Sequence, residues 1–404
     1  MNNKFCLIKA TVIFAVTMSM SACSYIPWFG DEEEVEIELR EPAELSELVS
    51  EVTIKQNWQV SLGGDAEERF IQLQPHVFDD KIAFAQTGGK VAVYELNSGR
   101  AVVSGSVVGP VSAGVGGNAK YLVTGTHDGV VTAINSKDGT QAWSTNVASE
   151  VVSVAHADND LAILRTNDNR ILGLAISTGE KLWAVTQTPP ALTLRGASVP
   201  IVRDGVIYAG MDNGKVIAIS TENGNVIWEA RVSVPSGRSE LERLVDIDGQ
   251  IAADDNFIYA ASYHGRVVSI SRENGRIRWA RDMASVSGVS IDNALVYVTD
   301  KDDNVWALEK ETGVSSWKQD KLLYRQLSAP VVQDKAVLVG DSQGFIHALS
   351  KQDGRIIGRA NFGKKPIHTS SMSTNTAAYI IDVSGRLASY SVVSANKSRD
   401  SKRN

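Results

Sequence analysis

Few residues in this sequence could bind a metal or act as a nucleophile or base. There are six histidines: His76, His127, His156, His264, His347 and His368. None forms a short metal-ligand spacing with another. The glycines are isolated and periodic rather than grouped into a phosphate-binding loop, and no Gly-x-Ser-x-Gly serine opens a helix. The sequence therefore predicts no catalytic residue, no metal site and no cofactor.

Cys23 is the one residue for which the surrounding sequence predicts chemistry. A basic start with Lys4 and Lys9 precedes the apolar stretch 10–20, which is too short for a stable span. The segment Met20-Ser21-Ala22-Cys23 resembles the lipobox of bacterial lipoproteins, although Met stands where Leu is usual. Residues 1–22 are thus predicted to be a lipoprotein signal peptide, cleaved before an acylated Cys23. The alternative is an ordinary secretory signal followed by a chance cysteine.

Cysteine usage and the flanking segments agree with a lipid anchor. Only Cys6 and Cys23 are present, and Cys6 leaves with the signal. Ser24, rather than Asp, follows Cys23, which in enteric-type lipoproteins implies the outer membrane. We therefore expect a protein anchored there by lipid and facing the periplasm. Residues 23–50 are predicted to be the acylated cysteine and an acidic flexible tether, and residues 395–404 a basic disordered tail.

A repeat of about forty residues organises the rest of the chain. Aligned copies begin at Gly89, Gly129, Asn169, Gly214, Gly265, Asn304, Gly344 and Gly385, with steps of 40, 40, 45, 51, 39, 40 and 41. Each copy has four strand-sized pieces separated by Gly, Asn or Asp turns, such as Asp204-Gly205. This period predicts an all-β fold, an eight-bladed β-propeller of four-stranded antiparallel blades, over residues 51–394.

Tryptophan recurs at one position of the repeat, near the end of the fourth strand. The copies are Trp143, Trp183, Trp228, Trp279 and Trp317, with Val103 and Gly358 in its place in two units. We interpret these indoles as packing between blades; a sugar-stacking or cofactor face is the alternative. The last repeat lacks a fourth strand, whereas an unmatched one lies near Val52–Trp58. We therefore expect the N-terminal strand to complete the last blade and close the ring.

The repeat resembles that of pyrroloquinoline-quinone dehydrogenases, which are eight-bladed propellers. Those enzymes carry vicinal cysteines over the quinone and an acidic and amide cluster for calcium, and this chain has no cysteine after Cys23. The lipobox, the acidic tether and a single propeller together resemble the BamB family over essentially the whole chain. This resemblance implies a non-catalytic scaffold lipoprotein of the machinery that assembles β-barrel proteins in the outer membrane of Gram-negative bacteria.

The same resemblance implies the partners. They are the periplasmic POTRA-type domains of the central barrel subunit and unfolded outer membrane proteins. Acidic and basic residues are mixed along the propeller, and the net charge is −7, so no nucleic-acid partner is expected. Two other functions stay open: a quinoprotein-like periplasmic enzyme, and a propeller that binds cell-wall glycan or a small ligand.

Two consecutive insertions interrupt the period and suggest where a partner binds. From the fourth-strand tryptophan to the next hairpin turn, Trp183 to Asp204 spans 21 positions and Trp228 to Asp254 spans 26, against 14–17 in ordinary repeats. Both insertions join neighbouring blades, so we expect them side by side on one face. The predicted partner-binding residues are Leu192, Leu194, Arg195, Asp246 and Asp248. In the alternative, Leu192, Leu194, Val245 and Ile247 fold back onto the blades while the two aspartates shape a turn.

Overall fold

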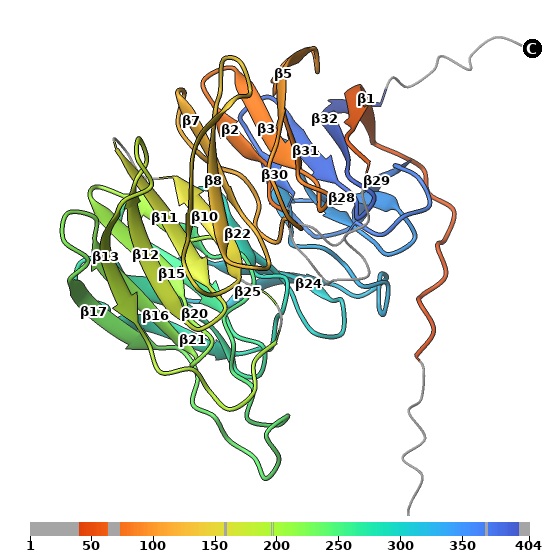
Figure 1. Cartoon of the computed structure of the whole chain (residues 1–404). Coiled ribbons are helices and arrows are strands. Elements are labelled where there is room, and N and C mark those ends of the chain that lie inside the picture. The colour runs from red at the N-terminus through yellow and green to blue at the C-terminus, as the bar shows by residue number, and fades with distance from the viewer. Residues whose placement is uncertain are drawn as a thin grey trace, which may run out of the picture. The chain divides into compact units, whose positions relative to one another are not determined.

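Eight antiparallel sheets of four strands make up the described part of the chain, as Figure 1 shows. The computed structural model describes residues 40–63, 73–156, 160–194, 196, 198–367 and 371–395. The chain divides into two units, Met1–Arg40 and Glu41–Asn404, and the second contains all of the sheets. Within the described ranges, no helix has the length and apolar character needed to cross a membrane.

The first four blades follow one another along the chain. Blade 1 contains β2 (His76–Phe78), β3 (Lys81–Ala85), β4 (Lys90–Glu95) and β5 (Ala101–Ser106). Blade 2 contains β6 (Gly116–Gly117), β7 (Tyr121–Gly125), β8 (Val130–Asn135) and β9 (Gln141–Asn146). Blade 3 contains β10 (Val151–His156), β11 (Leu161–Thr166), β12 (Arg170–Ala175) and β13 (Lys181–Thr186). Blade 4 contains β14 (Ile201–Arg203), β15 (Val206–Gly210), β16 (Lys215–Ser220) and β17 (Val226–Arg231).

The last four blades complete the ring. Blade 5 contains β18 (Ala252–Ala253), β19 (Phe257–Ala261), β20 (Arg266–Ser271) and β21 (Ile277–Asp282). Blade 6 contains β22 (Val289–Ile291), β23 (Leu295–Thr299), β24 (Val305–Glu309) and β25 (Ser315–Gln319). Blade 7 contains β26 (Val331–Val332), β27 (Ala336–Gly340), β28 (Phe345–Ser350) and β29 (Ile356–Asn361). Blade 8 contains β30 (Met372–Ser373), β31 (Ala378–Ile381), β32 (Arg386–Ser394) and, as its outer strand, β1 (Val52–Ser61).

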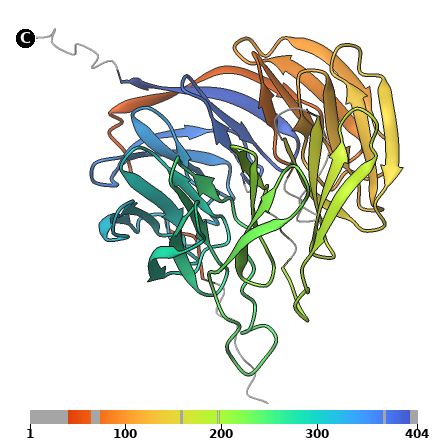
Figure 2. The same ribbon diagram turned by 90° about the vertical axis from the view of Figure 1, so that its left-hand side faces the viewer.

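Local turn chemistry and burial both follow from the sequence pattern. Asp204 and Gly205 have φ values of 51° and 75°, the left-handed pair that a two-residue hairpin requires. The middle strands β15 and β16 are almost wholly buried, because neighbouring blades cover both of their faces. The outer strand β17 instead alternates exposed and buried residues. Figure 2 shows the sheets arranged side by side around the ring.

The periodic tryptophans join each blade to the next. The indole Nε1 of each donates to a backbone carbonyl of the following blade over 2.7–3.1 Å. The pairs are Trp58 with Leu96, Trp143 with Ile176, Trp183 with Thr221, Trp228 with Arg272, Trp279 with Lys310 and Trp317 with Lys351. The interpretation of these side chains as inter-blade packing is therefore confirmed.

A glycine of the following blade lies under each indole ring. These glycines are Gly99, Gly179, Gly224, Gly275, Gly313 and Gly354, all with φ between 67° and 77°. A Cβ atom at any of them would come within 2.4–2.8 Å of the tryptophan ring. Glycine is therefore required at this position for two reasons: the backbone is left-handed, and the indole fills the space that a side chain would need.

A β-bulge precedes the tryptophan position in every blade. The register between the third and fourth strands shifts by one residue, as at Ala218/Ile219 opposite Trp228. The same shift occurs in the other seven blades, including blade 8, where it falls between Gln56 and Trp58 of β1. Since a bulge re-aims the side chain that follows it, this repeated irregularity helps to turn each indole toward the next blade.

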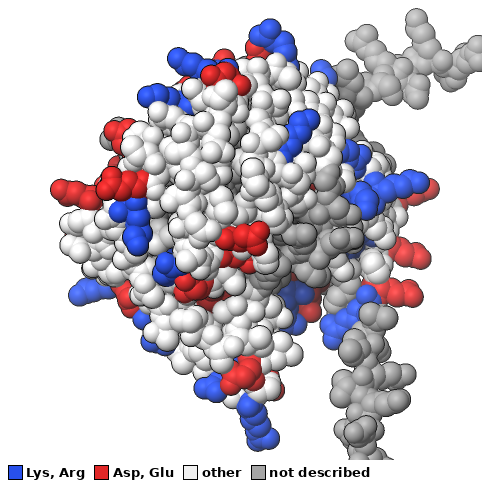
Figure 3. Space-filling model, in the orientation of Figure 1, with Lys and Arg blue, Asp and Glu red and all other residues white. Residues whose placement is uncertain are grey.

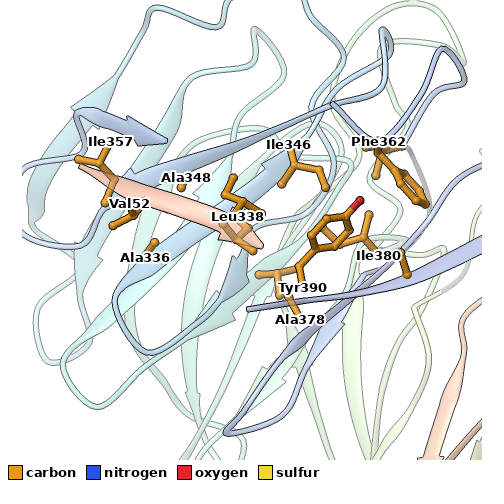
Figure 4. Packing of buried hydrophobic residues seen from close by; sticks show 14 residues of the cluster. Val52, Ala336, Leu338, Ile346, Ala348, Ile357, Phe362, Ala378, Ile380 and Tyr390 are labelled. Atoms are coloured by element: carbon orange, nitrogen blue, oxygen red, sulfur yellow. The ribbon is translucent and has the colours of Figure 1, made fainter. Parts of the chain in front are cut away.

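The N-terminal strand closes the ring, as predicted. β1 pairs antiparallel with β32 from Val52 opposite Ser394 to Ser61 opposite Arg386. On the side of blade 7, Val52 packs in a buried cluster with Leu338 and Ile357, shown in Figure 4. On the side of blade 1, the Trp58 indole reaches Leu96. The two ends of the fold are thus held together by one strand.

We expect Trp58→Ala to lower the free energy of unfolding by about 3–5 kcal/mol, because it removes a buried indole and its hydrogen bond at the ring closure. Chemical denaturation of the purified protein measures the loss. Gln59→Ala, at the exposed neighbouring position of the same strand, is the control and should stay within about 0.5 kcal/mol of wild type. Equal stability of the two variants would contradict a closing role for Trp58.

Candidate partner-binding face

All connections from one blade to the next lie on the same face of the propeller. The strands of a blade alternate in direction, so the chain leaves each fourth strand and enters the next first strand at one face. We call this the loop face. It carries residues 187–200, between β13 and β14, and residues 232–251, between β17 and β18. These are the two insertions found in the sequence.

The structure brings the two insertions into contact. The backbone N–H of Leu194 donates to the Asp246 carboxylate. Gly196 lies so close to Asp248 that a Cβ atom there would be 2.8 Å from the aspartate Cβ. The first insertion is therefore held against the second by the hydrogen bond to Asp246, and Gly196 allows the close approach because it has no side chain.

The predicted site residues differ in how accessible they are. Leu192 is 44% exposed and Leu194 is partly buried. Asp246 and Asp248 are only 1% and 6% exposed. Arg195 and the predicted lipidation site Cys23 lie outside the described residues.

The expectation of exposed apolar side chains is wrong for the second insertion. Leu244, Val245 and Ile247 are buried. Ile247 packs against Gly210, and its N–H donates to the Met211 carbonyl of blade 4. This stretch folds back onto the blade below it, which is the alternative that the sequence left open.

The exposed part of the second insertion is residues 234–243, which project from the loop face as the green loop in Figure 1. Val234 is 57% and Leu241 61% exposed. The sequence held a signal for this loop. Val151 is the counterpart of Ile247 in an ordinary repeat, because the N–H of each donates to a turn of the preceding blade. Val151 follows Trp143 by eight positions, whereas Ile247 follows Trp228 by nineteen. The exposed loop 234–243 accounts for ten of these eleven extra residues.

A buried group of charges lies beneath the two insertions. Arg165 of β11 is 1% exposed and pairs with Asp212 in a turn of blade 4. Its Nη2 is also 4.0 Å from Asp248 Oδ1. Among the residues that the structure describes, neither oxygen of Asp248 has a hydrogen-bond partner, and Oδ1 of Asp246 has none. One buried guanidinium therefore lies beside two buried carboxyl groups, those of Asp212 and Asp248, and the buried carboxyl group of Asp246 completes the cluster.

Burial decides the protonation of two of these carboxyl groups. It raises the pKa of Asp248 to about 8, and the charges of Asp212 and Asp246 act in the same direction while Arg165 opposes them. Burial also raises the pKa of Asp246 to about 7, against the hydrogen bond that Leu194 donates. Near neutral pH these two aspartates can hold protons, which removes the cost of burying unpaired negative charge.

The described residues contain two histidine–carboxylate pairs of the kind used in acid–base catalysis. His127 Nδ1 lies 2.9 Å from Glu150 Oε1, and the histidine side chain is 47% exposed. The second pair is inaccessible. His347 Nε2 lies 2.9 Å from Asp341 Oδ2, and both side chains are fully buried, so a substrate cannot reach them. The segment Gly340-Asp341-Ser342-Gln343-Gly344 matches the letters of a nucleophile elbow but joins two strands, β27 and β28, instead of a strand and a helix. No cluster of three His, Cys, Asp or Glu in the described ranges could hold a metal.

Charge on the outer surface is mixed in sign. Figure 3 shows Lys and Arg interspersed with Asp and Glu on the face in view, with uncharged surface between them. Continuous basic stripes, which bind nucleic acid, are not seen on that face. What the loop face offers is exposed aliphatic side chains from two neighbouring connections, a combination suited to contact with another protein.

We expect Asp248→Asn to stabilise the protein increasingly as the pH rises from 4 to 8. An unfolded aspartate loses its proton near pH 4, whereas the folded protein keeps it up to about pH 8. The free energy of unfolding of the wild-type protein therefore falls across this window, by up to about 1.4 kcal/mol per pH unit. The Asp248→Asn variant has no such loss, because asparagine does not titrate. Thermal unfolding at several pH values measures the difference, with the exposed Asp320→Asn as control. A difference between variant and wild type that does not change with pH would contradict the protonated state.

The comparisons with known proteins agree with the fold. The family model described as outer membrane protein assembly factor BamB matches residues 87–319. The BamB of Bordetella pertussis is 31% identical over 380 residues, covering 94% of this chain and 96% of the relative. The BamB of Pseudomonas aeruginosa is 34% identical over 351 residues, covering 87% and 92%. The crystal structure of BamB from Moraxella catarrhalis aligns with a TM-score of 0.77 and 27% identity, covering 84% of this chain and 99% of that one. The chain belongs to the BamB family of outer membrane protein assembly factors.

Proposed function

We propose that this protein is a non-catalytic scaffold lipoprotein of the outer membrane β-barrel assembly machinery. Its loop face binds the periplasmic, POTRA-type domains of the central barrel subunit. The observation that carries this proposal is the contact between the two insertions, which places Leu192 at the surface beside a second, projecting connection. Family membership supports the process in which it acts.

The proposed interface has a contacting layer and a supporting layer. Leu192, with Leu194 at its edge, enters an apolar pocket of the partner, and Arg195 pairs with a partner carboxylate. Asp246 and Asp248 act from below, because both are buried. Asp246 holds the backbone of Leu194, so the position of the leucines depends on it. Hot-spot side chains commonly depend on such buried support.

The projecting residues 234–243 extend the same interface. Val234 and Leu241 are the exposed aliphatic side chains of this loop. A protruding loop with two apolar side chains suits insertion between domains of a partner. Two contact points on neighbouring blades would fix the orientation of a rigid disc better than one.

Unfolded outer membrane proteins are the second proposed class of partner. The bulge positions of the outer strands expose aliphatic side chains at Leu182 of β13 and Ile227 of β17. An outer strand also has backbone groups that no neighbouring strand occupies. Edge pairing with an extended chain uses both features, so these strands are suited to hold unfolded β-strands briefly.

We expect the double variant Leu192→Asp, Leu194→Asp to abolish co-purification of the central barrel subunit from gently solubilised membranes. Charged side chains cannot enter an apolar pocket without losing their hydration. Val314→Asp is the matched control, because Val314 is 57% exposed but lies in the turn between β24 and β25, on the opposite face. Both variants should keep the wild-type melting temperature. Normal capture by the double variant would contradict the interface.

We expect Cys23 to carry the acyl chains that attach the protein to the outer membrane. Cys23→Ser should leave a protein that is uncleaved or released from the membrane, since two or more acyl chains are needed for stable anchoring. Mass spectrometry of the N-terminal peptide measures the lipid directly. A wild-type peptide that starts elsewhere, or lacks acyl groups, would contradict the anchor.

A further inference from the structure

A short segment before the propeller is bound along its side. We call residues 41–50 the strap; the sequence analysis assigned them to the tether. The N–H of Ala43 donates to the Leu323 carbonyl over 2.9 Å, and the Ala43 carbonyl accepts from Arg325 Nη1 over 2.8 Å. Further along, the Ser46 carbonyl accepts from Arg359 Nη1 over 3.1 Å. The strap is therefore held through its backbone at two points.

A buried network holds the first arginine in place. Arg325 is 2% exposed, and its guanidinium donates to Asp341 Oδ2 and to Gln343 Oε1 as well as to the strap. Asp341 in turn contacts His347, and Arg359 approaches the other ring nitrogen of that histidine at 3.4 Å. The two arginines that bind the strap are thus linked through one buried Asp–His pair. Groups fixed in this way lose little conformational entropy when they bind a backbone.

The loop that receives the strap is itself held in an unusual conformation. Tyr324 and Gln326 both have left-handed backbones, with φ values of 57° and 54°. The N–H groups of Gln326 and Leu327 donate to the Asp303 carboxylate over 2.7 and 2.8 Å. Non-glycine residues adopt this conformation only where surrounding contacts require it. Here it leaves the Leu323 carbonyl and Arg325 facing the strap.

One side chain of the strap adds an apolar contact. Leu45 packs against the hydrophobic cluster of blades 6 and 7 that contains Leu322 and Leu327. Val49, four residues later, is 91% exposed. After the strap, Glu51 pairs with Arg355 of blade 7, with Nη2 2.9 Å from Oε2, and the chain then enters β1.

We propose that the strap is a clamp that fixes where the N-terminal segment leaves the propeller, and that this exit lies on the loop face. Leu323 and Arg325 belong to the connection between β25 and β26, so they lie on the same face as both insertions. Figure 1 shows the red-orange strap running along the propeller toward the face from which the green loop projects. The N-terminal segment thereby leaves the propeller on the face that carries the proposed partner site. This orientation rests on the proposed function, whereas the clamp itself does not.

The clamp also shortens the reach of the anchor. From Cys23 to Ala43 there are 20 residues, and from Cys23 to Glu51 there are 28. At about 3.4 Å per extended residue, these correspond to upper limits of about 70 and 95 Å. A shorter tether raises the effective concentration of the loop face near membrane-bound partners.

Spin labelling tests the clamp directly. The full-length chain has cysteines only at positions 6 and 23, so Cys6→Ser and Cys23→Ser with Ser46→Cys gives one label site. The Ser46 side chain is exposed, and the label leaves the backbone contact with Arg359 in place. We expect a slow nitroxide spectrum in this protein and in the matched control Val49→Ser. Leu45→Ser and Arg359→Gln should each give several-fold faster motion at an unchanged melting temperature.

Two results would overturn the clamp: fast motion in the unmodified background, or slow motion that neither Leu45→Ser nor Arg359→Gln changes. Orientation is tested separately with lipidated protein in vesicles that contain an acceptor lipid. A dye at Ser236→Cys, on the loop face, should transfer energy more efficiently than a dye at Glu273→Cys, on the opposite face, and Leu45→Ser should reduce the difference. Equal transfer from the two positions would overturn the orientation. Protein that fails to bind vesicles would contradict the proposed lipid anchor, while the nitroxide spectra still decide the clamp.

Discussion

Six of the eight blades are fixed to the next by an indole that lies on a glycine and donates to a carbonyl beyond it. The contact requires a large flat ring on one blade, a residue without Cβ on the other, and a bulge that aims the ring. Because these three features recur in most blades, neighbouring blades pack against each other with nearly the same geometry around the ring. Val103 and Gly358 are the exceptions. At Gly358 the side chain of Val52 occupies part of the space, so the N-terminal strand substitutes for the missing indole. The inner strands can remain short because the outer rim determines the geometry.

Most of this architecture was predictable because its signals are local and repeated. Turn glycines, alternating strands and Trp at one position gave the number of blades, and an unmatched Trp58 indicated the closing strand. The bulge was not predicted, since it adds a single residue whose side chain can be of any kind. Residues 244–248 were misjudged for a different reason. Alternating Val245, Asp246 and Ile247 read like an exposed stretch, but Gly210 and Gly214 of the preceding blade leave room for the aliphatic side chains. That contact is tertiary: it joins residues more than thirty positions apart, and no local pattern in residues 244–248 encodes it.

The loop face combines rigid support with deviations from the repeat. The buried Arg165, Asp212, Asp246 and Asp248 group lies under the two insertions, so their surface conformation depends on buried ionisable side chains. On the other side of the ring, Arg325 and Asp341 form a second buried pair, which receives the strap. Both groups connect a blade turn with the chain that passes over it. In a fold of nearly equal units, such pairs distinguish one connection from another.

The pairing of β1 with β32 also determines when, during synthesis of the chain, the ring can close. Val52 and Ser394 are partners, although most of the chain lies between them. β1 leaves the site of synthesis first and cannot find its partner until the last strand has followed. Until then blade 8 has an open edge, and Trp58 has only blade 1 against which to pack. The first strand must therefore stay unpaired until the whole chain is available, and a long-range contact of this kind forms slowly. A nascent chain cut short anywhere before β32 leaves the ring open.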